Sequence, residues 1–554
     1  MNPLTAGDEC LLQNQKWRYP NMKRLVSLLL ALVMCLGVVN LAAAEAPTEL
    51  TIAVVRRNTD ITETFNEKMW VKDAEEALNV KLNFVELIEG AVAEPLAALM
   101  AGDLPDVFFM GMQFGDSLIT MNSGLFRPIT EEEIKTYAPT YYNLVETYAE
   151  GWRESMTYPD GNMYGMMSGP LTSEQHLTQG LFVINTAWLK KLGLEKPTTL
   201  DELYTVLKAF KEQDPNGNGE ADEIPIDFCN SDYTSNILKF ASSWGMAIDN
   251  GTYYNVVDGN AVGTVNTPEF REFLEYYHKL GQEGLFNLEG FSQTGDQYSA
   301  TIDSLRVGCF WCWAPYSFVK SDARFDYEGF VLPAAEGCQT KVLPNQPDRT
   351  NRNGWVITKE CENWEKAMQL YDYWCEPTRA RNITEGAMGI AWEWLDEEAQ
   401  TWTTLTAPTT EEEGYAEWVE KMKAAGYEQY IDKQYNGGNT LGYVNNAPFI
   451  TSLASYDVEA NPEVNAVLRL KAIREFVAKD AIGECIPKII VPAEAQEELD
   501  FMTDGLKDLI NGFTAESVIN GVTDESWNAF QSDLEKYNYS FYIEWYNKLC
   551  HGEL

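Results

Sequence analysis

From residue 50 onward, short apolar runs alternate with stretches that have the spacing of an amphipathic helix. Runs rich in β-branched and aromatic residues occupy 50–55, 80–87 and 106–110. Apolar residues at helical spacing lie between them, at 72–78 and at about 94–101. Strands that alternate with helices are typical of an α/β sheet, so the pattern predicts one at the start of the chain.

The loops after these strands are candidate ligand-binding positions. In open α/β sheets, ligands bind beyond the carboxyl ends of the strands. Arg57 follows the first predicted strand, and Gln113 follows the third. Both are candidates for the wall of a binding cleft, with the alternative that each is an ordinary loop residue.

The same alternation continues further along the chain. Residues 158–165 predict a hairpin with a Pro-Asp-Gly turn, 181–185 predict a strand, and 186–194 predict a helix that stops at glycine. The next predicted helix, 200–212, begins with a threonine cap and acidic residues in its first turn. This helix leads directly into a loop rich in oxygen-bearing side chains.

The loop at 214–225 has the spacing of a calcium-binding loop. Oxygen-bearing side chains recur at alternate positions, and Gly219 stands where a chain wrapping an ion turns sharply. The predicted ligands are the side chains of Asp214, Asn216, Asn218, Asp222 and Glu223 and the backbone carbonyl of Glu220. Pro225 occupies the position where an EF-hand has its closing glutamate, so Glu223 would complete the shell. The alternative is an acidic surface turn, which the same residues also favour.

Composition and charge narrow the class of protein. The 554 residues suffice for two or three domains, and 45% hydrophobic residues suffice for large cores. The formal net charge is −43, from 41 basic and 84 acidic residues. Nucleic acids and anionic membranes attract basic surfaces, so this charge argues against either as a partner. It fits a protein that works in an aqueous, extracytoplasmic setting.

The N-terminal segment predicts export. A basic region begins at Met22, an apolar run follows at 25–39, and a small-residue cleavage site ends at Ala44. We therefore expect 22–44 to be a secretory signal peptide. Residues 1–21 precede it and are interpreted as a non-native upstream extension.

The cysteines leave their pairing open. Lipid attachment at Cys35 is an alternative to simple secretion, but Met34 precedes it where a small residue is preferred. Without Cys10 and Cys35, eight cysteines remain, at irregular spacing that does not determine a connectivity. The CxxC sequence at 309–312 lies in an apolar run and is interpreted as a pair of buried structural thiols.

Several motifs succeed one another in a characteristic order. They include WLKKLGL at 188–194, PTTLDE at 197–202, the loop at 214–225, RVGCFWCW at 306–313 and NGWVITK at 353–359. The closing segments at 524–530 and 542–546 continue the series. In this order the motifs resemble the type 1 extracellular solute-binding proteins of sugar importers, especially the long oligosaccharide- and alginate-binding members.

The resemblance implies an α/β fold with two interwoven lobes that close over a ligand by hinge motion. Residues 45–180 and 331–390 would form the first lobe, and 181–330 and 391–554 the second lobe with the C-terminal helices. The implied function is capture of an oligosaccharide by a monomer and delivery to the permease subunits of an ABC transporter, without catalysis. The implied calcium ion is structural, because a fully coordinated ion has no open position for Lewis-acid chemistry.

Two tryptophans are the main candidates for a sugar platform. Sugars present apolar C–H faces and a rim of hydroxyls, so their binders combine aromatic rings with amide or charged groups. Trp311 and Trp313 are two residues apart on a predicted strand and would face the same side. By position in the family, Trp313 is the stronger candidate. The alternative is that both belong to the core of an apolar strand.

Polar candidates come from two further segments. Gln175, His176 and Gln179 precede the first crossing between the lobes, where the family often contacts ligand; as plain loop residues they would need no explanation. Trp392 and Glu393 would border the cleft or, alternatively, cap a helix on the surface. The acidic net charge weakly favours a neutral glycan over a polyuronate, since a polyanion needs a basic cleft.

An enzyme is the main alternative class. The chain has three histidines, of which His278 lies in a helical pattern and His551 near the C-terminal end. Nucleophile-elbow and phosphate-loop motifs are absent from the sequence. A glycoside hydrolase or lyase needs only two carboxylates across a cleft, and 84 acidic residues offer many pairs. This alternative stays open, as does a peptide-binding transport protein, because aromatic pockets also bind peptides.

Overall fold

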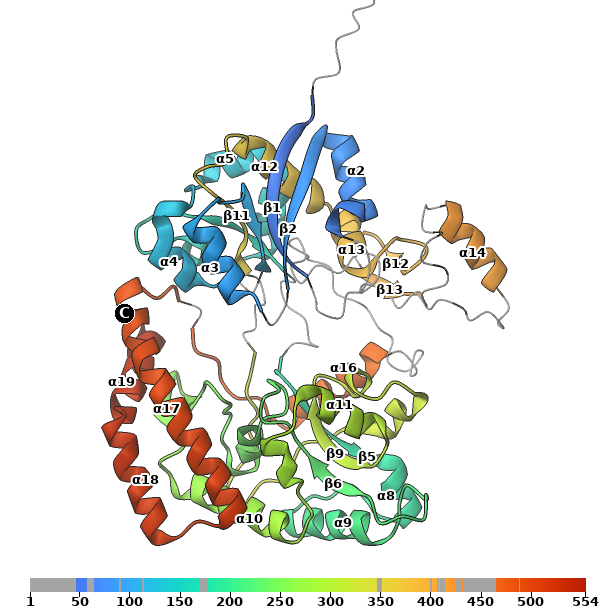
Figure 1. Ribbon diagram of the computed structural model, residues 1–554, viewed down its shortest axis with the longest axis vertical. Helices are drawn as coiled ribbons and strands as arrows, with labels where there is room; N and C mark the ends of the chain where they lie inside the picture. Colours follow the sequence, from blue (N-terminus) through green and yellow to red (C-terminus); the bar gives the residue numbers. More distant parts are fainter. Residues whose placement is uncertain are drawn as a thin grey trace, which may run out of the picture. The chain divides into compact units, whose positions relative to one another are not determined.

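The computed structural model describes most of the chain after residue 45. The described residues are 46–56, 64–88, 91–111, 114–169, 177–345, 351–398, 401–405, 408, 414–424, 428, 431, 465–487 and 489–554. They contain two main β-sheets with helices packed around each (Figure 1). Every helix in these ranges is too short or too polar for a membrane span. The predicted signal peptide at 22–44 and the extension at 1–21 lie outside the described residues.

The first sheet has the strand order β2-β1-β3-β11-β4. Its strands are β1 (Thr48–Arg56), β2 (Val80–Ile88), β3 (Val107–Phe109), β4 (Gly165–Ser168) and β11 (Asn351–Ile357). β1 and β3 are parallel, and β11 is antiparallel to both β3 and β4. The three strands predicted at the start of the chain are confirmed as β1, β2 and β3.

Both faces of this sheet are buried, which explains the unbroken apolar runs. Ile52, Val54 and Phe109 belong to one apolar cluster, and Ala53 and Phe108 belong to another. Successive side chains of a strand point to opposite faces, so a strand covered on both sides needs apolar residues throughout. The helices around this sheet are α2 (Met69–Leu78), α3 (Ala93–Ala101), α4 (Asp116–Asn122), α5 (Glu131–Tyr137), α6 (Pro139–Tyr148), α7 (Trp152–Met156), α12 (Trp364–Trp374) and α13 (Pro377–Glu385).

The second sheet has the order β10-β5-β9-β6. Its strands are β5 (Leu181–Asn185), β6 (Ile224–Asp227), β9 (Val307–Cys312) and β10 (Tyr327–Gly329). β9 is antiparallel to β5 and parallel to β6. The surrounding helices include α8 (Thr186–Leu192), α9 (Leu200–Glu212), α10 (Pro268–Gln282) and α11 (Gly295–Asp303).

The predicted start of α9 is confirmed. The Thr199 hydroxyl accepts a hydrogen bond from the backbone amide of Glu202 at 3.1 Å, which satisfies one of the unpaired donors of the first turn. The helix ends at Glu212, directly before the predicted calcium loop.

The chain passes between the two sheets more than once. It leaves the first sheet after β4 to form β5, and it returns from β10 to form β11. Later, α16 (Asn465–Ala478) packs beside β10, where a Cβ atom at Gly329 would collide with Ala472. Neither sheet is therefore built from one continuous segment, although the exact lobe boundaries stay a prediction.

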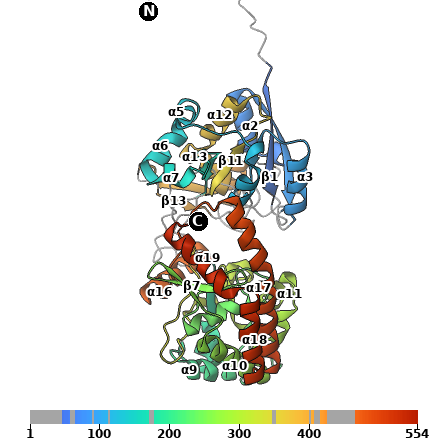
Figure 2. The same cartoon turned by 90° about the vertical axis from the view of Figure 1, so that its left-hand side faces the viewer.

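Three long helices complete the C-terminal part. α17 (Ala493–Asn520), α18 (Asp524–Lys536) and α19 (Tyr539–His551) lie side by side (Figures 1 and 2), and α17 packs against α10. A small hairpin of β7 (Tyr254–Val257) and β8 (Asn260–Gly263) packs against α19. The Tyr539 hydroxyl of α19 donates to the Tyr253 carbonyl at 2.6 Å. This hydrogen bond ties α19 to the residue that precedes β7.

A second hairpin, of β12 (Trp392–Asp396) and β13 (Thr401–Thr404), has its own apolar cluster. Trp392, Trp402 and Trp418 pack there, the last from α14 (Tyr415–Ala424), together with Met69 of α2. The sequence places this segment with the second lobe from residue 391 onward. Met69 of α2, a helix of the first sheet, packs against these tryptophans, and the assignment of the hairpin to a lobe stays a prediction.

Candidate functional site

The predicted calcium loop connects α9 to β6 and is folded around Asp214. Its Oδ1 accepts a hydrogen bond from the Gly217 amide at 2.8 Å, and its Oδ2 accepts one from the Gly219 amide at 3.2 Å. Gly219 has a φ of 80°, a left-handed conformation that glycine adopts without steric cost. The sharp turn expected at this glycine is therefore present.

Two asparagines of the loop converge on Asp222. The side-chain amides of Asn216 and Asn218 donate to its Oδ1 at 3.1 and 3.0 Å. The hydrogen bond from Asn218 is the largest cause that lowers the pKa of Asp222. Asp222 is thus an ionised acceptor that faces two amide nitrogens, while the amide oxygens of Asn216 and Asn218 accept from the backbone amides of Asn218 and Glu220 at 3.0 and 2.7 Å. Carboxylate and amide oxygens are ligand types that a hard cation prefers, and the loop supplies both.

Glu223 is the unusual residue of the loop. It is buried, and both carboxylate oxygens have no hydrogen-bond partner among the described residues. Burial raises its pKa, and the negative charges of Asp214 and Asp222 add to the rise. A cation would remove this penalty, so the loop fits Ca²⁺. Carboxylates alone do not form a metal cluster in the described residues, so the fit depends on asparagine and backbone oxygens as well.

Aromatic side chains gather at the carboxyl edge of the second sheet. Because β6 and β9 are parallel, their carboxyl ends lie at the same edge, where α/β proteins bind ligands. Tyr233 follows β6, whereas Trp313 and Tyr316 follow β9. Tyr233 is 66% exposed, and Trp313 is partly exposed. We call these three residues the aromatic cluster.

Tyr316 connects the members of this cluster. Burial raises its pKa, and a hydrogen bond with Trp313 and the positive charge of Arg469 act in the opposite direction. Tyr233 is close enough to influence the same pKa. The indole of Trp313 therefore lies beside a phenol, that of Tyr316, and the guanidinium group of Arg469, with the exposed Tyr233 in the same neighbourhood. Aromatic rings beside a charged group suit stacking and hydrogen bonding with a sugar.

The two candidate tryptophans have different surroundings. Trp311 is 2% exposed and packs against Phe182 and Phe240, with ring centroids 5.6 and 6.1 Å away. β9 ends at Cys312, so Trp313 lies beyond the strand. The regular alternation on which a shared face depends stops between them. Trp311 is therefore a core residue, as the alternative held for both tryptophans, whereas Trp313 is partly exposed and belongs to the aromatic cluster; that the two share a face stays a prediction.

Sequence reasoning did not identify Tyr233 or Arg469. Tyr233 could have been found, because it follows a strand of the second sheet as Arg57 follows one of the first. Arg469 could not, because α16 lies far along the chain from Trp313 and only the tertiary structure brings the two side chains together.

Gln179 is held by a buried cation. Lys239 is 5% exposed, and its Nζ donates to the Gln179 side-chain oxygen at 3.2 Å. Burial lowers the pKa of Lys239, while Asp249, 3.9 Å away, favours the charged form. The Gln179 carboxamide is therefore fixed in orientation, as a specificity group needs to be.

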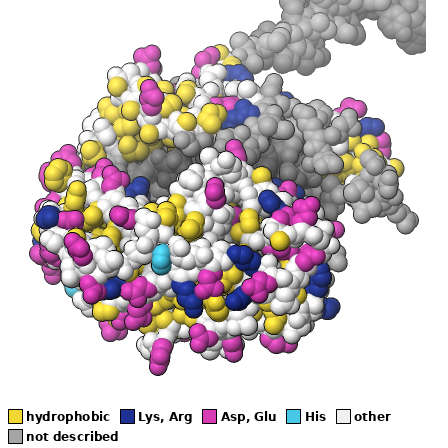
Figure 3. Space-filling model, turned by 60° about the horizontal axis from the view of Figure 1, so that its bottom comes forward, with side chains coloured by type: hydrophobic (Ala, Val, Ile, Leu, Met, Phe, Trp, Pro, Cys, Tyr) yellow, Lys and Arg dark blue, Asp and Glu magenta, His cyan; other side chains and the backbone are white. Residues whose placement is uncertain are grey.

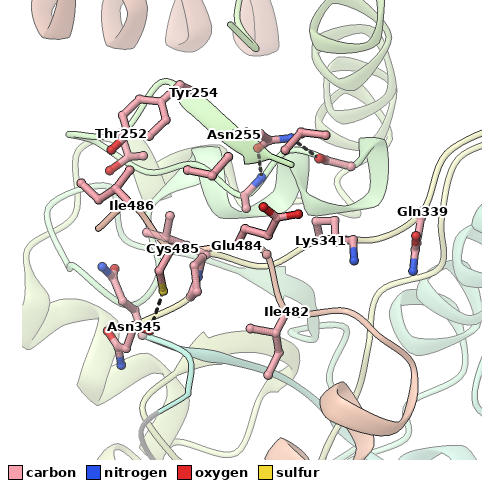
Figure 4. A pocket seen from close by; sticks show the side chains of 18 of the residues that line it. Thr252, Tyr254, Asn255, Gln339, Lys341, Asn345, Ile482, Glu484, Cys485 and Ile486 are labelled. Carbon is pink, nitrogen blue, oxygen red and sulfur yellow. Dashed lines mark hydrogen bonds between the residues drawn. The ribbon is translucent and has the colours of Figure 1, made fainter. Parts of the chain in front are cut away.

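Gln179 also lines a cavity of about 630 Å³ (Figure 4). Gln339 and Lys341 lie at one end of it and Asn345 lies at the other, with Tyr254 on its wall. Lys341 forms an ion pair with Asp480 at 3.2 Å. This volume and the mixture of polar and apolar walls are those of a small-molecule pocket.

Two further candidates, Trp392 and Glu393, belong to the β12–β13 hairpin and not to the loops after β6 and β9 that carry the aromatic cluster. Trp392 is fully buried, and its indole nitrogen donates to the Asn382 side chain at 3.1 Å and to the Gly386 carbonyl at 2.9 Å. It belongs to the packing of the hairpin, and Glu393 beside it is exposed. Four candidates lie outside the described residues, namely Arg57, Gln113, Gln175 and His176.

The cysteines of the described residues are free thiols. Cys309 and Cys312 are fully buried in β9, and burial raises the pKa of both. A thiol that resists ionisation is a poor nucleophile and a poor metal ligand. The interpretation of the CxxC sequence as structural is supported.

Asp227, the last residue of β6, is a buried carboxyl group. Its Oδ1 accepts hydrogen bonds from Asn287 at 2.8 Å and from Gln293 at 2.9 Å. Its Oδ2 has no hydrogen-bond partner among the described residues. Burial raises the pKa of Asp227 from the usual 3.8 to about 6, and the hydrogen bonds oppose the rise.

This carboxyl group should make stability depend on pH. A group whose pKa is higher in the folded state keeps its proton longer there, so its contribution is present below pH 3.8 and lost as the pH rises through about 6. We expect the unfolding free energy of the protein, relative to that of Asp227→Asn, to fall by about 3 kcal/mol between acid and neutral pH. Chemical denaturation of both proteins across this range measures the difference, and a constant difference would contradict the expectation.

Two α/β sheets built from interleaved segments, with candidate ligand groups at the carboxyl edge of one of them, define a two-lobed ligand-binding protein. Comparison with known proteins gives the family. Residues 58–378, more than half of the chain, match the family of bacterial extracellular solute-binding proteins, and the chain belongs to that family. The predicted family and the predicted α/β, two-lobed fold are confirmed.

Individual relatives agree with this family. The chain is 26% identical over 495 residues to the fructooligosaccharide ABC transporter substrate-binding protein FusA of Streptococcus pneumoniae, which covers 86% of each chain. A solved HMO-binding, ABC-transporter-associated solute-binding protein from Bifidobacterium longum infantis has a TM-score of 0.74 at 22% identity, covering 91% of this chain and 99% of that one. FusA structures with kestose and, as an EF-hand mutant, with fructo-nystose both have a TM-score of 0.73 at 23% identity, with the same coverage.

Proposed function

We propose that this protein captures an oligosaccharide outside the cytoplasm and delivers it to the permease of an ABC transporter. The observation that carries this proposal is the aromatic cluster, which presents a partly exposed tryptophan at the ligand-binding edge of an α/β sheet. The similarity to FusA over 86% of both chains supports a sugar rather than a peptide as the ligand. The family and the relative are named for binding and transport, which supports a protein without catalysis.

A neutral oligosaccharide such as a fructooligosaccharide suits this chain better than a polyuronate. The net charge is −43, and a polyanion would be repelled unless a basic cleft received it. On the face shown in Figure 3, Lys and Arg side chains lie among Asp and Glu side chains rather than in a patch of their own. A neutral sugar needs only stacking and hydrogen bonds, which the aromatic cluster and Gln179 can supply.

The mechanism in this proposal is a shift of population. Trp313 would stack on a sugar ring and Gln179 would hydrogen-bond a hydroxyl, so the second lobe would hold the ligand first. Groups of the first lobe would then complete the shell and favour a closed state that the permease recognises. A monomer exported by the signal peptide at 22–44 is sufficient for this cycle.

Calcium belongs to the same proposal as a structural ion. The ion would be held by Asp214, Asn216, Asn218, Asp222, Glu223 and the Glu220 carbonyl. It would neutralise the buried Glu223 carboxylate and tie the end of α9 to the start of β6. The EF-hand mutant recorded for FusA supports the presence of such a loop in a similar protein.

A thermal-shift panel tests the proposed function. The panel contains kestose, fructo-nystose, a galacturonate oligosaccharide and an oligopeptide, each followed by an assay for new reducing ends. We expect the neutral oligosaccharides to raise the melting temperature without product formation. New reducing ends would identify a glycoside hydrolase, and stabilisation by the peptide alone would identify a peptide binder.

A further inference from the structure

The guanidinium group of Arg469 lies against the indole ring of Trp313. Its central carbon is 3.4 Å from the ring centroid, and the Arg469 side chain is fully buried. At this distance the planar guanidinium stacks on the ring and adds a cation–π attraction, which is stronger away from water. The planar guanidinium group of Arg469 therefore supports one face of the Trp313 ring, and Trp313 as a residue is partly exposed.

Arg469 is itself fixed by two backbone carbonyls. One nitrogen donates to the carbonyl of Trp313, and the other donates to the carbonyl of Thr178 at 2.7 Å. The side chain of Asn345 donates to the same Thr178 carbonyl at 2.9 Å. Arg469 in α16 thus links the residue after β9 to the segment that leads into β5. Asn345, which shares the Thr178 carbonyl, lies in the segment before β11 of the first sheet.

A buried arginine is a costly way to fill space. Removing a guanidinium from water is unfavourable, and an apolar residue of similar volume would often stabilise the fold as well or better. The planar fork of arginine, by contrast, can stack on a ring and bind two carbonyls at fixed angles, which a lysine or a methionine cannot reproduce. The geometry therefore favours a role in orientation over a role in stability alone.

We propose that Arg469 is a positioning residue that holds Trp313 in the plane where it stacks on a sugar ring. This inference rests on the proposed function, because it assumes that Trp313 is the sugar platform. A ring fixed before the ligand arrives loses less side-chain entropy on binding, so affinity depends on Arg469 although it is buried behind the platform.

The test compares Arg469→Lys with a matched control, Arg381→Lys. Arg381 is also buried and stacks on a tryptophan, Trp402, at 4.1 Å, but within the β12–β13 hairpin cluster. Affinity is measured by calorimetry with kestose, or with the panel oligosaccharide that stabilises the protein most. We expect Arg469→Lys to weaken binding about tenfold and Arg381→Lys to leave it unchanged.

A double-mutant cycle separates positioning from a general loss of structure. If Arg469 acts through Trp313, Arg469→Lys should cause no further loss of affinity in the Trp313→Ala background. An equal loss in both backgrounds would overturn the inference, as would full affinity in the single variant. Full affinity of Trp313→Ala would instead overturn the sugar platform of the proposed function, so the two failures can be told apart.

A measurement on the unmutated side chain covers the case in which Arg469→Lys does not fold. The protein is labelled with 5-fluorotryptophan, and the Trp313 resonance is assigned by its absence in Trp313→Phe. A ring held by Arg469 should give one narrow fluorine resonance before any sugar is added. A broad or multiple resonance that narrows only with ligand would show that the ring is not fixed in advance and would overturn the inference.

Discussion

Replacement of Trp313 by alanine is expected to weaken oligosaccharide binding by about tenfold to a hundredfold. The substitution removes the indole of a partly exposed residue at the carboxyl edge of the second sheet and with it the apolar surface that a sugar ring would cover. It also takes the stacking partner from the buried guanidinium of Arg469. Calorimetric titration with the oligosaccharide that stabilises the protein most gives the change, and the ligand-induced change in tryptophan fluorescence should largely disappear.

Trp394→Ala is the control for this prediction. Trp394 is likewise partly exposed, but it lies on β12 and its indole nitrogen donates to Thr378 at 3.4 Å. We expect this variant to bind sugar with unchanged affinity. If Trp394→Ala binds poorly and Trp313→Ala binds normally, the site lies at the β12–β13 hairpin, where Trp392 and Glu393 are found.

Removal of calcium is expected to lower the melting temperature by several degrees. An ion present at about one hundred times its dissociation constant stabilises the folded state by about 2.7 kcal/mol, and chelation removes this contribution. The physical source is the buried Glu223 carboxylate, which has no hydrogen-bond donor among the described residues and carries a raised pKa. Melting curves with calcium and with EGTA measure the effect, while sugar affinity at saturation should change little.

Two glutamates of the same loop give a matched pair for this experiment. Glu223→Gln should abolish the calcium-dependent rise in melting temperature and should melt at or above the unmodified protein in EGTA, because it removes a buried charge. Glu220→Gln should keep the full calcium response, since the exposed Glu220 would contribute only its backbone carbonyl. Identical melting curves of the unmodified protein with and without calcium would contradict the proposal that a calcium ion stabilises this loop.

The local elements of this fold could be predicted from the sequence because their causes are local. β5 and α9 have the predicted bounds, since an apolar run and a threonine cap act within a few residues of themselves. The sharp turn at Gly219 is equally local, because it depends on one glycine and on the Asp214 carboxylate five residues before it. The order of such motifs was enough to indicate the family.

In the candidate site, too, some residues could be predicted from the sequence and others could not. The sequence alone indicated Trp313, and it indicated the loop at 214–225 with its full set of oxygen donors. It favoured Trp313 over Trp311 by position in the family, but it left open whether either is a core residue, because burial depends on which neighbours pair with the strand and cover it. The tertiary structure decided this for Trp311 by burying it against Phe182 and Phe240.

Contacts between distant segments were decided by the tertiary structure alone. Arg469 reaches Trp313 only because α16 packs beside β10, and the loops that carry Tyr233 and Tyr316 lie at the same sheet edge only because β6 and β9 are parallel neighbours. The hairpin at Trp392 packs on Met69 for the same kind of reason. Spacing along a chain encodes turns, caps and faces, whereas these contacts depend on how whole elements pack, and no local pattern records that packing.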